Sequence, residues 1–211
     1  MDLEVAGSSP VTHPLPKPLR GNKFRKGLCL GSIYMTNSRQ IETFCNEARQ
    51  MGALDAVVVA PPRQVFVAAW VRLRCQYGCS EYGQCLTCPP NSPTPETTRK
   101  VLDEYQTAIL LHGDNWELVR EIARTMERTI FLAGYYKAFA FVCGPCWLCK
   151  TCVVGRKGVK VAACKHPDKA RPAMEAAGID VFATARAAGL PIEVVTSEEC
   201  PQNYYALVLV E

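Results

Sequence analysis

The chain has 211 residues, 48% of them apolar, and is therefore long enough to bury a hydrophobic core as one domain. Its 24 basic and 20 acidic residues leave a net charge of only +4. No dense Lys/Arg patch is interleaved with stacking aromatics, so we expect no nucleic-acid partner. The apolar runs are far too short to span a bilayer, so we expect no membrane partner either.

Twelve cysteines are the most unusual feature of the composition. They are too sparse for a small secreted disulfide scaffold, and we find no signal peptide with a basic start and an apolar central run. We therefore expect a cytoplasmic protein. In that reducing environment, closely spaced cysteines indicate metal binding rather than disulfides.

Residues 1–34 are predicted to form a disordered tail that is rich in proline and basic residues. Prolines remove backbone hydrogen-bond donors, and the basic run supplies no periodic apolar face; these residues are Pro10, Pro14, Pro16, Pro18, Arg20, Lys23, Arg25 and Lys26. The remaining residues, 35–211, are predicted to form a single metal-binding domain.

Apolar residues recur at helical spacing between Ser38 and Gly52, which predicts a helix there. Cys45 lies on the apolar face of this helix and is interpreted as a core residue rather than a ligand. Two runs of β type follow, at residues 56–60 and 65–71. The second predicted strand would lead directly into the first group of clustered cysteines.

This upstream loop, residues 75–90, carries four candidate metal ligands: Cys75, Cys79, Cys85 and Cys88. Glycines and prolines between and after them allow tight turns, and the backbone amides that these turns free can bond to cluster sulfurs. The spacing differs from that of radical S-adenosylmethionine enzymes, because the third cysteine arrives only at position 85. We therefore do not predict that chemistry.

The rest of the chain alternates between helical and β patterns. We predict helices at residues 95–105, 115–134, 171–178 and 179–189, and strands at residues 108–111, 137–142, 192–195 and 204–210. A strand, a helix and a second strand in succession imply a crossover onto a shared sheet. The predicted fold class is α/β, with α+β as the alternative, and consists of a single sheet with crossover helices and two cysteine-rich loops.

The downstream loop, residues 143–167, has the densest spacing. It reads Cys143-Gly-Pro-Cys146-Trp-Leu-Cys149-Lys-Thr-Cys152, and Cys164-Lys-His-Pro167 follows. Cysteines at every third position match neither a helix nor a strand period, but they suit a loop that wraps a compact inorganic core. The predicted ligands are Cys146, Cys149, Cys152 and Cys164. Cys143 is placed outside this set, because Gly144-Pro145 turns the chain after it.

The spacing favours iron–sulfur clusters over zinc. Zinc sites usually join two Cys-x2-Cys pairs across a long spacer, whereas consecutive Cys-x2-Cys steps resemble the cluster ligation of bacterial ferredoxins. This chain is not a ferredoxin copy, because Cys164 follows Cys152 at a distance and Pro167 lies three positions beyond it. We predict two [4Fe–4S] clusters, each with four cysteines, with zinc as the alternative.

The three histidines are weaker candidates. His13 lies in the predicted tail, and His112 ends a predicted strand, where we expect a capped or surface residue. His166 stands beside Cys164 and is the only histidine expected near a centre. Cys29 and Cys200 lack partners at ligand spacing and are excluded.

Several blocks resemble a family of predicted metal-binding proteins from bacteria and archaea, catalogued as domain of unknown function 2284. The resemblance rests on Cys75-Gln-Tyr-Gly-Cys79, Cys88-Pro-Pro90, Gly144-Pro-Cys146-Trp-Leu-Cys149, Cys164-Lys-His-Pro167, Arg171-Pro-Ala-Met-Glu175 and Gly178-Ile-Asp-Val181. It covers the chain from about Met35 to the end. The resemblance implies metal binding and no particular reaction.

Three functions are consistent with these features. The first is electron transfer or other redox chemistry through two clusters, with a redox partner protein. The second is a metalloenzyme that uses one cluster to bind or activate a small substrate, with Arg171, Glu175 and Asp180 as the charged groups of interest. The third is a zinc-stabilised interaction module. The sequence predicts no catalytic residue, no organic cofactor site and no oligomeric state.

Overall fold

The computed structural model describes residues 30–155, 163–197 and 199–211. Most of the predicted tail, up to residue 29, lies outside this part of the chain. Residues 30–34 belong to helix α1, Leu30–Gln50, which therefore begins before the predicted domain boundary at residue 35. Among the described residues, no helix is both long enough and apolar enough to cross a membrane.

The four strands form one sheet in the order β1-β2-β4-β3, and all neighbours are antiparallel. The strands are β1 Asp55–Val59, β2 Ala108–Gly113, β3 Phe139–Phe141 and β4 Tyr204–Leu209. Because β2 and β3 both run antiparallel to β4, they run parallel to each other on its two sides. Helix α5, Trp116–Leu132, connects them, which confirms the predicted crossover.

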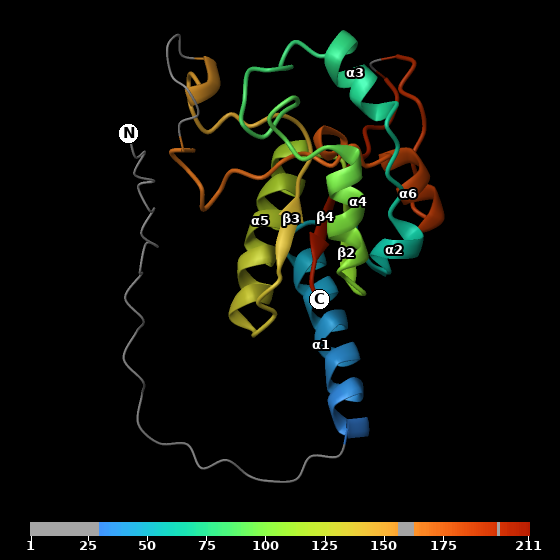
Figure 1. Ribbon diagram of the computed structural model, residues 1–211. Coiled ribbons are helices and arrows are strands. Elements are labelled where there is room, and N and C mark those ends of the chain that lie inside the picture. The colour runs from blue at the N-terminus through green and yellow to red at the C-terminus, as the bar shows by residue number, and fades with distance from the viewer. Residues whose placement is uncertain (1–29, 156–162, 198) are drawn as a thin grey trace, which may run out of the picture.

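Both faces of the sheet are buried, so the molecule has three layers (Figure 1). Alternate residues of β2 enter different cores: Ile109 and Leu111 face α1 and α5, whereas Ala108 and Leu110 face the opposite side. Helices α4, Pro95–Asp103, and α6, Val181–Ala187, cover that second face. The predicted α/β class is confirmed, and every residue of β2 is buried.

Local sequence signals explain where these helices begin. Side chains of Thr94, Asn115 and Asp180 accept hydrogen bonds from backbone amides in the first turns of α4, α5 and α6. Pro95 occupies the first position of α4, where its missing N–H costs nothing. The buried stripe of α5 consists largely of the residues predicted from helical spacing, namely Val119, Ile122, Ala123, Met126 and Ile130.

Three predicted elements are wrong. Instead of a strand at 65–71, the chain forms the short helix α2, Pro61–Gln64, then an isolated bridge at Val67, and then helix α3, Val71–Gly78. Instead of a helix at 171–178, only the 3₁₀ turn η2, Glu175–Ala177, is present; a second such turn, η1, spans Val153–Gly155. Residues 192–195 form no strand.

Tertiary contacts account for two of these errors. The backbone of Val67 bridges only to Ile179, because no further strand lies beside it, and the exposed rings of Phe66 and Trp70 provide no inward-facing alternation. Ala173 pairs in parallel with Val142, which holds the preceding segment extended and leaves only one turn before Gly178. Gly178 adopts the left-handed conformation, with φ of 82°, and ends that turn.

Candidate metal centres and the adjoining cavity

The upstream loop begins on helix α3 rather than at the end of a strand. Cys75 lies within α3, and Cys79 is the residue that ends it. The loop then folds back on itself, because the amide of Gly83 donates to the carbonyl of Pro89 at 2.8 Å and the side-chain amide of Asn91 donates to the carbonyl of Cys85 at 3.2 Å. These bonds give the cysteines of a loop without regular structure defined positions.

One arginine fixes the upstream loop to the rest of the fold. Nη1 of Arg72 donates to Oγ of Ser92 at 3.1 Å, to the carbonyl of Pro93 at 2.8 Å and to the carbonyl of Ala176 at 2.6 Å. Ser92 Oγ also donates to the Ala176 carbonyl, at 2.5 Å. Helix α3, the end of the loop and turn η2 are thus joined at one point.

The downstream loop is held by the same stretch of chain. After β3, the amide of Val142 donates to the carbonyl of Pro172, and the amide of Met174 donates to the carbonyl of Val142, both at 2.9 Å. Residues 172–176 therefore anchor both cysteine loops. Figure 1 shows them together at one end of the sheet, the same end as α3.

A buried cation supports the start of the downstream loop. Arg120, on α5, donates from Nε and Nη2 to the carbonyl of Cys143 at 3.2 and 2.9 Å. Its guanidinium carbon lies 4.5 Å from the ring centre of Trp116 and 5.8 Å from that of Trp147. These cation–π contacts and hydrogen bonds hold a positive charge beneath a run of thiols.

The two loops touch through their cysteines. The thiol of Cys85, in the upstream loop, donates to the carbonyl of Cys146 at 3.3 Å, across 61 positions of sequence. Burial, with smaller contributions from the neighbouring thiols of Cys88, Cys152 and Cys146, raises the pKa of Cys85 to about 12. Cys85 therefore lies close enough to the downstream loop to interact electrostatically with Cys146 and Cys152.

The other upstream cysteines interact chiefly with one another. Burial is the main cause of the raised pKa of Cys88, and the thiols of Cys79 and Cys75 add to it. Burial likewise raises the pKa of Cys75, with a smaller contribution from Cys79 and then Glu175. Cys75, Cys79 and Cys88 thus form a group of neighbours, which we call the upstream trio.

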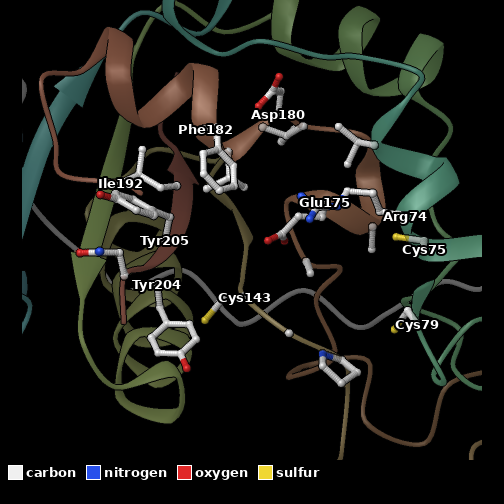
Figure 2. Close-up of a pocket in the computed structure, with 18 of the residues that line it drawn as sticks. Arg74, Cys75, Cys79, Cys143, Glu175, Asp180, Phe182, Ile192, Tyr204 and Tyr205 are labelled. Carbon is white, nitrogen blue, oxygen red and sulfur yellow. The ribbon is translucent and has the colours of Figure 1, made fainter. Parts of the chain in front are cut away.

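The upstream trio lines a cavity of about 560 Å³. Figure 2 shows Cys75 and Cys79 on one side of this cavity, with Glu175 and Cys143 further along its wall. Apolar and aromatic residues make up much of the remaining lining, among them Phe182, Ile192, Tyr204 and Tyr205. The volume lies within the range of small-molecule sites, and the few polar groups gather near the thiols.

Glu175 is an acid whose charge acts on Cys75 of the trio. Its side chain faces the cavity and has protein around it. Desolvation therefore raises the pKa of its carboxyl group, and the positive charge of Arg74 opposes this rise. Arg74 lines the same cavity.

The remaining predicted ligands, Cys149, Cys152 and Cys164, are half-buried. The backbone amide of His166 donates to the sulfur of Cys164 at 3.3 Å, an example of the amide–sulfur contact that tunes cysteine-bound metals. Within the described ranges, no three cysteine, histidine or acidic side chains lie close enough together to hold one metal ion. The division of the eight cysteines into two tetrads remains a prediction.

Residues placed outside the centres have clear positions. Cys45 is fully buried in the core, as predicted. Cys143 is buried, and its thiol donates to the carbonyl of Trp116 at 3.3 Å. The expectation of a surface or capped His112 is wrong: its ring is 3% exposed, bonds to Asp55 and Asn203 at 2.8 Å each, and stacks on Tyr205. His13 and Cys29 lie outside the described residues.

Two of the three predicted charged groups line the cavity. Glu175 and Asp180 do so, although the Asp180 side chain is also occupied in capping α6. Arg171 instead forms a double hydrogen bond with Glu127, at 2.7 and 2.5 Å. It is therefore a structural residue of the connection between α5 and the downstream segment.

The supporting roles of Arg72 and Arg120 at the cysteine loops were not predicted from the sequence. Arg120 carries a recognisable signal, because it lies one helical turn from Trp116 and beside Val119, on the apolar stripe of a strongly amphipathic helix. A charged residue in such a stripe needs a buried partner. Arg72 carries no comparable signal, since its acceptors, the hydroxyl of Ser92 and the carbonyls of Pro93 and Ala176, belong to two distant segments.

The chemistry of the donors fits a thiolate-bound metal. All eight predicted ligands are free thiols in the structure. Sulfur donors select soft and borderline metals such as zinc, copper(I) and the iron of clusters, and binding requires loss of the thiol protons.

The profile of a family described as Predicted metal-binding protein (DUF2284) matches residues 59–210, well over half of the chain. The chain therefore belongs to this family, as its cysteine blocks predicted. Comparisons with curated proteins and with solved structures gave no match.

Proposed function

We propose that this member of the predicted metal-binding family holds two [4Fe–4S] clusters and works in electron transfer or related redox chemistry. The candidate ligands are Cys75, Cys79, Cys85, Cys88, Cys146, Cys149, Cys152 and Cys164. The observation that carries this proposal is the meeting of two cysteine loops at one end of the sheet. They are anchored on a common segment and touch through Cys85 and Cys146.

The spacing of the downstream cysteines favours iron over zinc. A loop with a cysteine at every third position fits a cluster, whereas structural zinc sites usually pair two separate knuckles. Clusters, when bound, supply one-electron chemistry, which zinc does not. The surroundings suit that role, because Arg120 places a buried cation near Cys143 and the His166 amide donates to a cysteine sulfur.

A redox partner protein could dock near the downstream loop. Lys150, Lys165 and Lys169 are exposed there, and a cluster of positive charge attracts an acidic partner. Arg171 does not join this surface, since Glu127 holds its guanidinium group.

The cavity at the upstream trio favours a second candidate function, that of a metalloenzyme. A relay of electrons needs no cavity of about 560 Å³ beside one centre, whereas binding of a small substrate does. Glu175 and Arg74 provide charged groups on its wall. In this function, the downstream centre would pass electrons to or from the upstream centre.

Anaerobic reconstitution tests the iron–sulfur proposal. We expect about eight irons and eight sulfides per chain, a visible charge-transfer band, and bleaching of that band by dithionite. Cys149→Ala should lose about half of the iron, because it removes a ligand of the downstream centre alone. A colourless protein with stoichiometric zinc would reject the redox function and support a zinc-stabilised interaction module.

A further inference from the structure

We propose that Cys85 would complete the downstream centre, and that Cys75, Cys79 and Cys88 alone would hold the upstream centre. A small organic molecule with a soft donor atom would then bind in the cavity beside these three cysteines and take the place of a fourth cysteine ligand. This inference rests on the proposed function, because it assigns cysteines to its two centres. It differs from the division that local spacing favours, in which all four upstream cysteines hold one centre.

The position of Cys85 carries the first step. Its side chain is only 6% exposed, and its sulfur lies 3.3 Å from the carbonyl oxygen of Cys146. Cys75, Cys79 and Cys88 all line the cavity. Cys85 is not among the described residues that line it. Cys85 thus contacts the downstream loop, whereas its neighbour Cys88 lines the cavity.

The local backbone explains how neighbours can serve different centres. The amide of Cys88 donates to the carbonyl of Cys85 at 3.2 Å, so the two residues lie at the ends of a tight turn. Asn91 holds the same carbonyl through its side-chain amide, at 3.2 Å. This turn fixes Cys85 beside the downstream loop while Cys88 remains with Cys75 and Cys79.

The count of ligands then changes at both centres. Cys146, Cys149 and Cys152 supply three ligands from one loop, and Cys85 is the remote fourth. An exchange of remote cysteines between centres is chemically ordinary where two clusters share a fold. Cys164 is consequently not required. The upstream trio lacks a fourth cysteine, so one position stays free for another donor.

The cavity indicates what that donor is. The three thiolates of the trio would hold a soft metal centre, for which a thiol or similar soft donor would be a suitable further ligand. Apolar side chains, including Phe182 and Ile192, would enclose the body of the molecule. Arg74, Glu81 and Glu175 are charged side chains of the lining near the thiols, where they can orient a polar group.

Double variants of the reconstituted full chain test the assignment of Cys85. In a Cys149→Ala background, only the upstream centre remains, and adding Cys85→Ala should cause no further loss of iron. In a Cys79→Ala background, only the downstream centre remains, and adding Cys85→Ala should remove nearly all of the iron. Cys164→Ala should keep the full iron content. Cys146→Ala and Cys75→Ala serve as second backgrounds if either first variant misfolds by circular dichroism.

The opposite pattern would overturn the assignment: loss of the remaining iron in Cys149→Ala/Cys85→Ala together with retention in Cys79→Ala/Cys85→Ala. Failure of the proposed function would give a different result. The unmodified chain would then hold zinc and no iron after reconstitution, before any variant is compared. The same double variants, counted for zinc, would still show to which centre Cys85 belongs.

Thiol binding tests the open position. Electron paramagnetic resonance of the reduced Cys149→Ala variant should respond saturably to 2-phenylethanethiol. It should bind this thiol about tenfold more tightly than ethanethiol, because the phenyl group is buried in the cavity. Phe182→Ala should reduce this preference, whereas Phe131→Ala, at an exposed position of α5, should not. No response from the upstream centre, an equal response to both thiols, or a response confined to Cys79→Ala would overturn the proposal.

Discussion

The guanidinium group of Arg120 donates two hydrogen bonds to the carbonyl oxygen of Cys143, at 3.2 and 2.9 Å, and thereby joins α5 to the start of the downstream cysteine loop. Arg120 is 7% exposed. The crossover helix that covers one face of the sheet therefore also positions the candidate metal centre.

Replacing Arg120 with methionine should destabilise the protein by about 1–3 kcal/mol, because the buried carbonyl of Cys143 loses its donors. Removal of a nearby cation should also lower the reduction potential of the downstream cluster. Chemical denaturation and a potentiometric titration measure the two effects. Arg128→Met, at an exposed position of the same helix, should change stability by no more than about 0.5 kcal/mol.

Gly144 should tolerate no side chain. Its φ is +67°, and a Cβ atom would lie 3.0 Å from Nη2 of Arg120. Gly144→Ala should therefore cost about 1–3 kcal/mol and shift the thermal midpoint downward. Gly83 is the matched control: its φ is +75°, but nothing lies within 4 Å of the added Cβ, so Gly83→Ala should cost less. Equal losses at both positions would show that the Arg120 contact has no effect.

The ion pair between Arg171 and Glu127 should have a large coupling energy. Both side chains are largely buried, at 14% and 13% exposure, and Glu127 also accepts from the amide of Ala140. Arg171→Met leaves a buried carboxylate unpaired and should destabilise by about 3–5 kcal/mol. Glu127→Gln keeps an acceptor for Ala140, and the double variant should be less destabilised than the sum of the two single changes. Additive losses would contradict the pairing.

Cys200 should be the most reactive described thiol in the metal-free protein. Hydrogen bonds from Ser197 and Thr196 lower its pKa to about 6, whereas burial raises the pKa of Cys143 to about 11. Because only the thiolate reacts, alkylation of Cys200 by iodoacetamide should be fast at pH 7 and should slow as the pH falls below about 6. Peptide mapping after brief labelling gives the rate at each cysteine. A rate at Cys200 that rises only near pH 9 would contradict this environment.

The sequence predicted the fold well where local patterns agree with burial. The stripe on α5 and the apolar run of β2 follow directly from hydrophobic periodicity. The strand predicted at residues 65–71 does not form, because no neighbouring strand pairs with this apolar run. Phe66 and Trp70 remain exposed. Strand formation depends on a partner, which local sequence does not reveal.

The sequence also located the cysteine loops but not their contact. Spacing identifies which cysteines are close along the chain, whereas the proximity of Cys85 and Cys146 arises from the anchoring of both loops on residues 172–176. The cavity was likewise beyond sequence reasoning, because its walls come from α3, η2, α6 and the chain before β4. Long-range packing determines both features.

Iron, zinc and acid-labile sulfide analysis of protein isolated without oxygen tests the central claim most directly. We predict about eight irons with an equal amount of sulfide per chain and no stoichiometric zinc, because consecutive Cys-x2-Cys steps and two adjoining thiol loops suit clusters. Stoichiometric zinc without sulfide would contradict the claim that the two cysteine loops hold iron–sulfur clusters.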